Sequence, residues 1–215
     1  MGNPDVFGGA LAALGVAYTK GKTGGVFNGV PNLPHVAGCD ATFPPHWGQQ
    51  AAYSTVAGRL YYIPYYFPQI VSYTGLRTYN AATGDSGEVY RTGVYTANPL
   101  TGLPDTLVID AGQTTLTAAA AVRTQAATFS PSYVGWHYLA IHHNSVVSPM
   151  GGISATAPGV GGFLFGINTG ELGAAATTQL FGCYYATTAY AALAATAVAP
   201  SGTLNQAPLV APYRT

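Results

Sequence analysis

The sequence contains very little charge. Seven Lys and Arg residues balance seven Asp and Glu residues, so only 7% of the 215 residues are charged and the net charge is zero. An ordinary soluble domain carries roughly 25% charged residues. A neutral chain has no long-range attraction to phosphate, so nucleic acid is not an expected partner. We expect a surface of hydroxyl and amide groups that is partly buried against other subunits.

Long apolar runs and a cysteine framework are also missing. No apolar run reaches the ~18 residues that span a bilayer, so membrane insertion is not expected. The apolar segment 7–18 has the length of a signal-peptide core, but it follows Asp5 instead of a basic stretch, so we interpret it as part of the mature protein. Cys39 and Cys183 do not make a disulfide framework, and we expect small buried side chains typical of assembly in a reducing cytosol. Whether they pair stays open.

Motifs for catalysis are scarce as well. Glycosidase chemistry needs two carboxylates at a fixed separation, and the few carboxylates here lie mostly in turn-like contexts. Asp105 and Asp110 flank TLVI and could sit at the two ends of one strand. No Gly-x-Ser-x-Gly is present, and GVAYTKGKT (15–23) has five residues between its glycines where a phosphate loop has four. We therefore expect a protein that is not an enzyme and uses no cofactor.

Three histidines in GWHYLAIHHN raise the question of a metal. In a strand, His137 and His143 share one face and His142 points to the other, so the adjacent pair cannot easily hold one ion. Three copies of one histidine at an oligomer axis would be the remaining arrangement. Hydrogen-bonded histidines near a strand end are commoner, and we assign no metal site.

The pattern of the chain changes at Arg59. Residues 1–57 are glycine-rich and weakly periodic, with two possible helical turns over 10–18, and cannot fill a core alone. From Arg59 onward, short apolar or alternating runs are separated by turn signals, which is typical of all-β proteins. Threonine, tyrosine and proline argue against a long helix in AYAALAATA. The sequence predicts an extended, partly helical arm (1–57) and an antiparallel β-sandwich (58–215).

The stretch RLYYIPYYFPQ (59–69) is unusually rich in rings. If it is a strand, one face belongs in the core, and prolines on the other face place the strand at a sheet edge or a bulge. The expected core face consists of Tyr61, Ile63, Tyr65 and Phe67. The other face, with Tyr62, Pro64, Tyr66 and Pro68, suits a neighbouring subunit or a flat ligand, because tyrosine buries area at low entropic cost.

Aromatic rings could also stack on the C–H faces of sugars. The candidate ligand-binding residues are Trp47, Tyr62, Tyr66 and Tyr184. Trp136 of GWHYLAI is instead expected to be a core residue of a central strand.

Four stretches, in this order, resemble the jelly-roll domain of tailed-bacteriophage virion proteins, a family of head-decoration, spike, tail-fibre and receptor-binding proteins. The stretches are RLYYIPYYFPQ, RTGVYTANPLTGLPDTLVIDAG, GWHYLAI and AYAALAATAVAPSGTLNQAPLVAPYRT. The resemblance covers about residues 58–215 and implies a jelly-roll-like β-sandwich. It brings no motif for catalysis or ligand contact.

The resemblance and the composition together predict a non-enzymatic structural protein of the virion of a tailed phage or phage-like particle. Residues 1–57 would anchor it to capsid or tail proteins, and a homotrimer is expected. As a head decoration, spike or short fibre it is expected to contact host surface polysaccharide. Two alternatives remain: a capsid cement protein without a ligand, and a stand-alone carbohydrate-binding module, which would be a monomer with a signal peptide. Head or tail position stays open.

Overall fold

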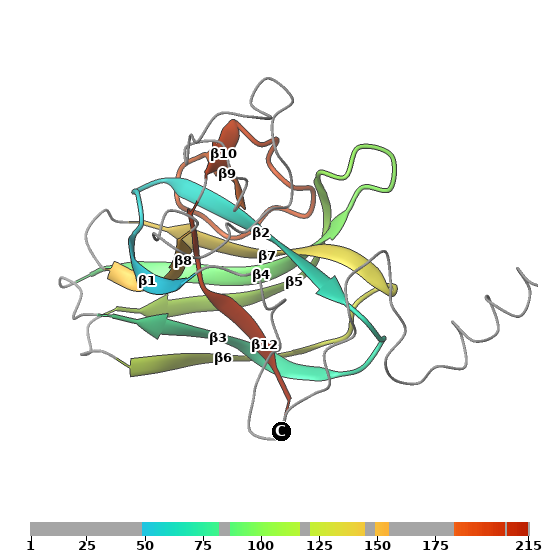
Figure 1. Cartoon of the computed structure of the whole chain (residues 1–215), viewed down its shortest axis with the longest axis horizontal. Helices are drawn as coiled ribbons and strands as arrows, with labels where there is room; N and C mark the ends of the chain where they lie inside the picture. The colour runs from blue at the N-terminus through green and yellow to red at the C-terminus, as the bar shows by residue number, and fades with distance from the viewer. Residues whose placement is uncertain are drawn as a thin grey trace, which may run out of the picture. The chain divides into compact units, whose positions relative to one another are not determined.

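The computed structural model describes residues 49–81, 87–116, 121–144, 149–154, 183–204 and 206–214, all within the compact unit His46–Thr215. Strands and connecting loops account for all of these residues (Figure 1). The prediction of an antiparallel all-β protein is therefore confirmed for the described chain. This part contains no helix that is long and apolar enough to cross a membrane. The two helical turns expected over 10–18, and Trp47, lie outside the described residues.

The strands follow one another along the chain, separated by loops. They are β1 (Gln49–Ser54), β2 (Arg59–Phe67), β3 (Tyr73–Asn80), β4 (Val89–Ala97), β5 (Pro104–Thr115), β6 (Ala121–Phe129), β7 (Gly135–His143), β8 (Pro149–Ser154), β9 (Cys183–Thr187), β10 (Gly202–Leu204), β11 (Gln206–Pro208) and β12 (Val210–Tyr213). β1 falls within the range expected for the arm, and it pairs with β8 over its whole length.

These strands form two sheets. The first has the order β1-β8-β3-β12, with β11 also on β8 and β6 also on β3, and the second has the order β10-β9-β2-β7-β4-β5 (Figure 1). The first eight strands pair in a nested, antiparallel way: β1 with β8, β2 with β7, β3 with β6 and β4 with β5. Residues 49–154 therefore pair like one long β-hairpin, in which β1 to β4 form one arm and β5 to β8 form the other.

Aromatic side chains fill the space between the two sheets. The ring of Phe67 lies 5.2 Å from that of Tyr73 and 6.1 Å from that of Phe129 in the facing sheet. The expected core face of β2 is confirmed, since the exposed fractions of its four side chains are 7% or less. Hydrogen bonds also cross between the sheets, from Thr92 to Gln125 and between Tyr90 and Thr78. The layers pack face to face, as in a β-sandwich.

β2 has two neighbouring strands, β7 and β9, and β9 pairs only with the half of β2 that contains no proline. β2 pairs with β7 from Leu60 to Phe67 but with β9 only from Arg59 to Tyr62. Pro64 lies past that point, where β7 is its one partner strand in the described chain. The expected edge position is therefore correct for the proline-containing half alone, because the other half is flanked on both sides.

Late strands complete the first sheet. β8 and β3 pair with each other only at Met150 and Asn80. Farther along, β11 pairs with β8 and β12 with β3, and the N–H of Leu209 between them donates to the carbonyl of Gly151 at 2.7 Å. The segment 206–213 thus occupies the position where β8 and β3 diverge.

Candidate functional site

The outer face of the second sheet collects most of the sequence-predicted site residues. Tyr62 of β2 is opposite Tyr184 of β9, and Tyr66 of β2 is opposite Trp136 of β7. Opposed residues of neighbouring antiparallel strands share a face. Three of the four candidates, Tyr62, Tyr66 and Tyr184, therefore lie on one face, and the fourth, Trp47, is outside the described residues.

Tyr62 itself is fully buried on this face. Its ring meets those of Tyr95 and Tyr138 edge-on at 5.5 and 6.4 Å, and its hydroxyl donates to the carbonyl of Val198 at 3.1 Å. Pro64 is buried too. The expectation that this face of β2 is free for a ligand is wrong at these two positions, because both side chains are buried, and at Tyr62 a distant segment of the chain provides the cover. Tyr62 offers no exposed ring surface to a sugar.

The covering segment is the loop 188–201, called the cover loop from here on. At one end the N–H of Thr188 donates to the carbonyl of Gly58, and at the other the N–H of Ser201 donates to the carbonyl of Tyr185. The N–H of Thr187 and Oγ of Ser201 are 3.4 Å apart, so the loop closes on itself. A compact loop with adjacent ends is an Ω-loop, a type that is frequently functional.

β5 is the last strand of the second sheet, and the middle of the cover loop pairs with its outer edge through backbone hydrogen bonds. The N–H of Leu107 donates to the carbonyl of Ala195 at 2.9 Å, and that of Ala197 donates to the carbonyl of Asp105 at 2.6 Å. A bridge between Thr106 and Thr196 lies between these bonds. Covering an edge in this way protects it from pairing with other chains.

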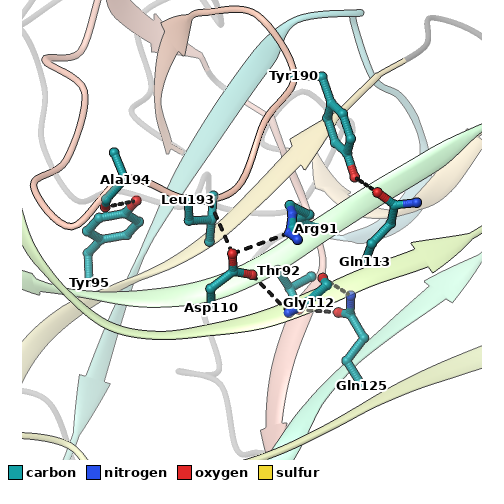
Figure 2. A network of polar contacts seen from close by, with 10 residues as sticks. All are labelled: Arg91, Thr92, Tyr95, Asp110, Gly112, Gln113, Gln125, Tyr190, Leu193 and Ala194. Atoms are coloured by element: carbon teal, nitrogen blue, oxygen red, sulfur yellow. Dashed lines mark hydrogen bonds and ion pairs between the residues drawn. The ribbon is translucent and has the colours of Figure 1, made fainter.

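Side chains of the sheet fasten the same loop from below (Figure 2). The hydroxyl of Tyr95 donates to the carbonyl of Ala194 at 2.9 Å, and the hydroxyl of Tyr190 donates to Gln113 at 3.2 Å. Leu193 is the buried side chain of the loop, and it rests on Gly93, where an added Cβ would come within 2.3 Å of it. The glycine is needed here for close approach.

Asp110 is the centre of the polar network in Figure 2. Its carboxylate accepts the N–H of Gly112 at 2.9 Å, the N–H of Leu193 at 3.1 Å and the guanidinium of Arg91 at 3.4 Å. From Gly112 the network continues into the first sheet, because the side-chain amide of Gln125 donates to the Gly112 carbonyl at 2.9 Å. Asp110 therefore ties the cover loop to β4 and β5, a structural role that its position beside TLVI did not indicate.

Part of the outer face stays accessible. Tyr66 and Trp136 are half-buried, and their rings meet edge-on at 5.4 Å. Tyr184 is half-buried as well, and its ring lies 6.0 Å from that of Tyr138. The expectation that Trp136 is a core residue is wrong, because its side chain is only half-buried on this face. We call Tyr66, Trp136 and Tyr184 the aromatic surface.

Beside the aromatic surface, three loops meet at one end of the sandwich. They connect β2 to β3, β4 to β5 and β6 to β7, and the strand registers place these connections at the same end. None of the residues in 68–72, 98–103 and 130–134 is charged. The exposed large apolar side chains of this loop end are Ile70 (57% exposed), Leu100 (93%), Tyr133 (36%) and Val134 (43%). Pattern reasoning missed them, because they lie in proline-containing turns outside any strand.

The three histidines of β7 divide between the two faces as predicted. His142 lies on the outer face beneath the cover loop, with its ring 5.1 Å from that of Tyr190. His137 is on the inner face near Phe67, and His143 is there near Tyr90. Burial lowers the pKa of both His137 and His142. Within the described residues, no group of three His, Cys, Asp or Glu side chains could hold a metal ion.

Burial keeps two titratable side chains of the second sheet neutral. Burial raises the pKa of Tyr95 to about 12, so its hydroxyl stays a neutral donor. Cys183 is a buried free thiol whose pKa burial also raises, which makes it a poor nucleophile. The neutral, half-exposed rings are suited to stacking against another molecule.

Comparison with known proteins adds no relative: the sequence matches no protein-family model, and neither the curated proteins nor the solved structures include one with significant similarity to it.

Proposed function

We propose that this chain is a non-enzymatic structural protein of the virion of a tailed phage or phage-like particle, built on a jelly roll. The observation that carries the proposal is the nested pairing of the first eight strands, β1 with β8 through β4 with β5. The resulting neighbours, β1-β8-β3-β6 and β2-β7-β4-β5, are those that a jelly roll would have, which supports this fold. Jelly rolls recur in viral capsid proteins, lectins and cupins.

A fold alone does not define a function, so the proposal also rests on the stretches that resemble phage virion proteins. Those stretches contain β2, β4, β5 and β7, which are adjacent in one sheet. The remaining stretch supplies the cover loop across the outer face of that sheet. The first three blocks thus lie together in one sheet, while the fourth supplies the cover loop on that sheet and also β11 and β12 of the other sheet.

The surface supports a subunit that is completed by its neighbours. The loop end presents exposed aliphatic side chains and no charge, and large exposed apolar patches mark protein contacts. We propose that the loop end contacts other copies of this chain in a homotrimer. Residues 1–57 would attach the trimer to capsid or tail proteins.

The aromatic surface supports contact with host polysaccharide. Tyr66 and Trp136 present ring surface beside the uncharged loop end. A neutral sugar can stack on such rings without losing the hydration of a charged group. This site would make the virion protein an attachment protein as well as a structural one.

Two measurements test the main proposal. Mass photometry of the purified chain should give a species of about three times the 22.0 kDa monomer. Gold-labelled antibody against the purified chain should decorate particles released from the producing cells. A monomer, together with particles that stay unlabelled, would refute the assignment.

A further inference from the structure

The cover loop is fastened to the sheet at a buried histidine. His142 is 2% exposed and lies opposite Leu60 of β2 and Arg91 of β4, with Tyr190 of the cover loop against its ring. The apolar contacts of the loop are limited to the buried Leu193 and the partly buried Ala197 and Val198, which pack against the same cluster, while most of its alanines face outward. Segments with few buried apolar contacts open more readily than the core beneath them.

Burial disfavours a positive charge on His142 in this position, although the backbone of Thr188 and Ala191 in the cover loop favours it. Histidinium carries two N–H donors, and Nε2 of His142 has no hydrogen-bond partner in the described structure. The charged neighbour on the same face is Arg91, and the carboxylate of Asp110 is already engaged by Arg91 and by two backbone N–H groups. Tyr190, whose ring lies against that of His142, is uncharged, because burial raises its pKa. Closed packing therefore favours uncharged His142.

We propose that the cover loop is a pH-sensitive flap, closed over the outer face while His142 is neutral and released when His142 is protonated. Release would leave the β7 framework folded and would uncover Tyr62 and Tyr95, which the closed loop buries. This inference does not depend on the virion assignment.

The direction of the pH dependence follows from the titration of the two states. Burial lowers the pKa of His142 in the closed state, and the nearby Arg91 acts the same way, while the backbone of Thr188 and Ala191 opposes the shift. In the released state the pKa returns toward about 6.5. Release is therefore favoured as the pH falls below about 6.5, and each unit of pKa difference raises the open-to-closed ratio up to about tenfold.

Hydrogen exchange of the full chain tests the proposal between about pH 7.5 and about pH 5.5, on either side of the histidine pKa. After correction for the intrinsic rate, protection of a peptide covering 188–201 should fall about tenfold or more relative to a peptide covering β7. In His142→Gln this pH-dependent loss should disappear. The matched control is His137→Gln, which changes a buried histidine away from the cover loop and should leave the loss in place.

Two outcomes would overturn the flap: constant relative protection of the loop in the unaltered protein, or an undiminished loss in His142→Gln. If His142→Gln does not fold, NMR titration of the unaltered protein decides the matter. The His142 ring and the amides of Ala191 to Leu193 should then share one midpoint below about 6.5. Separate midpoints, or loop amides whose chemical shifts do not change with pH, would rule the flap out.

Discussion

Tyr62 and Val198 are 136 positions apart in the sequence, yet the tyrosine hydroxyl donates a 3.1 Å hydrogen bond to the valine carbonyl. The bond joins the centre of the second sheet to the cover loop. It explains why a ring that alternation places on the outer face is buried. Several predictions depend on how the cover loop and the loop end are attached.

Replacing Tyr62 with phenylalanine removes this bond and keeps the ring packing. The carbonyl of Val198 is then left without its donor, and we expect a loss of about 1 kcal/mol in the free energy of unfolding. Urea unfolding followed by circular dichroism measures it. Tyr185→Phe is the control, because the ring that faces Arg59 is kept, and it should change stability by less than about 0.5 kcal/mol. Equal losses in the two variants would contradict the role of the bond.

The packing of the cover loop can be tested by replacing its buried Leu193 with alanine and by making the same substitution at the exposed Leu100 as a control. Leu193 is 6% exposed and Leu100 is 93% exposed. Leu193→Ala should lower the free energy of unfolding by about 2 to 3 kcal/mol, because it removes buried methyl groups and leaves a cavity above Gly93. Leu100→Ala should leave it nearly unchanged. Chemical denaturation of both variants gives the comparison, and a neutral Leu193→Ala would mean that the loop is not packed as described.

Acid should destabilise the whole fold through its buried histidines. Burial lowers the pKa of His137 and His142, so the unfolded chain binds more protons than the folded one as the pH falls below about 6.5. The stabilisation is complete above that value and is lost below it, by about 1.4 kcal/mol for each unit of pKa difference. Urea midpoints across this range measure the loss, and a midpoint that rises on acidification would reverse the sign.

Charge placed on the loop end should disrupt the proposed trimer. Leu100→Glu puts a carboxylate on an exposed turn, where it should not affect folding of the monomer but would be desolvated in a subunit contact. Mass photometry should then report monomers. Val122→Glu is the control, since Val122 is 60% exposed on β6, away from the loop end. A trimer that persists in Leu100→Glu would place the subunit contact elsewhere.

The proposed polysaccharide site depends on Trp136. Removing a stacking ring costs ~1 kcal/mol or more, so Trp136→Ala should weaken binding by about tenfold on a glycan array. Tyr79→Ala, which removes a half-buried ring from the first sheet, should bind normally. Binding that survives in Trp136→Ala would reject the site. If the unaltered protein binds no glycan while deletion of its gene weakens particles, the cement alternative is correct.

The strands could be predicted because their information is local. Alternation in 59–67 identified the inner face of β2, and the spacing of His137, His142 and His143 gave their two faces. The nested strand order could not be derived in this way, because pairing is decided between segments far apart in sequence. Resemblance suggested a jelly roll without locating a single pair.

The cover loop had no readable signal. Its sequence, rich in alanine, has no period, and most of its fastening uses backbone carbonyls and N–H groups that any residue supplies. The burial of Tyr62 was therefore missed, although RLYYIPYYFPQ was recognised as a strand. Trp136 is the opposite case: its apolar neighbours predict a core position, but its ring is only half-buried on the outer face.

The insertion of 206–213 between β8 and β3 sets an order of events during synthesis. A ribosome that has completed β8 has not yet released the residues that fill this gap, so the first sheet stays open while translation continues. A chain interrupted before residue 206 would expose unpaired backbone and become a substrate for proteases. The first sheet is therefore closed by residues that the chain supplies after its other described strands.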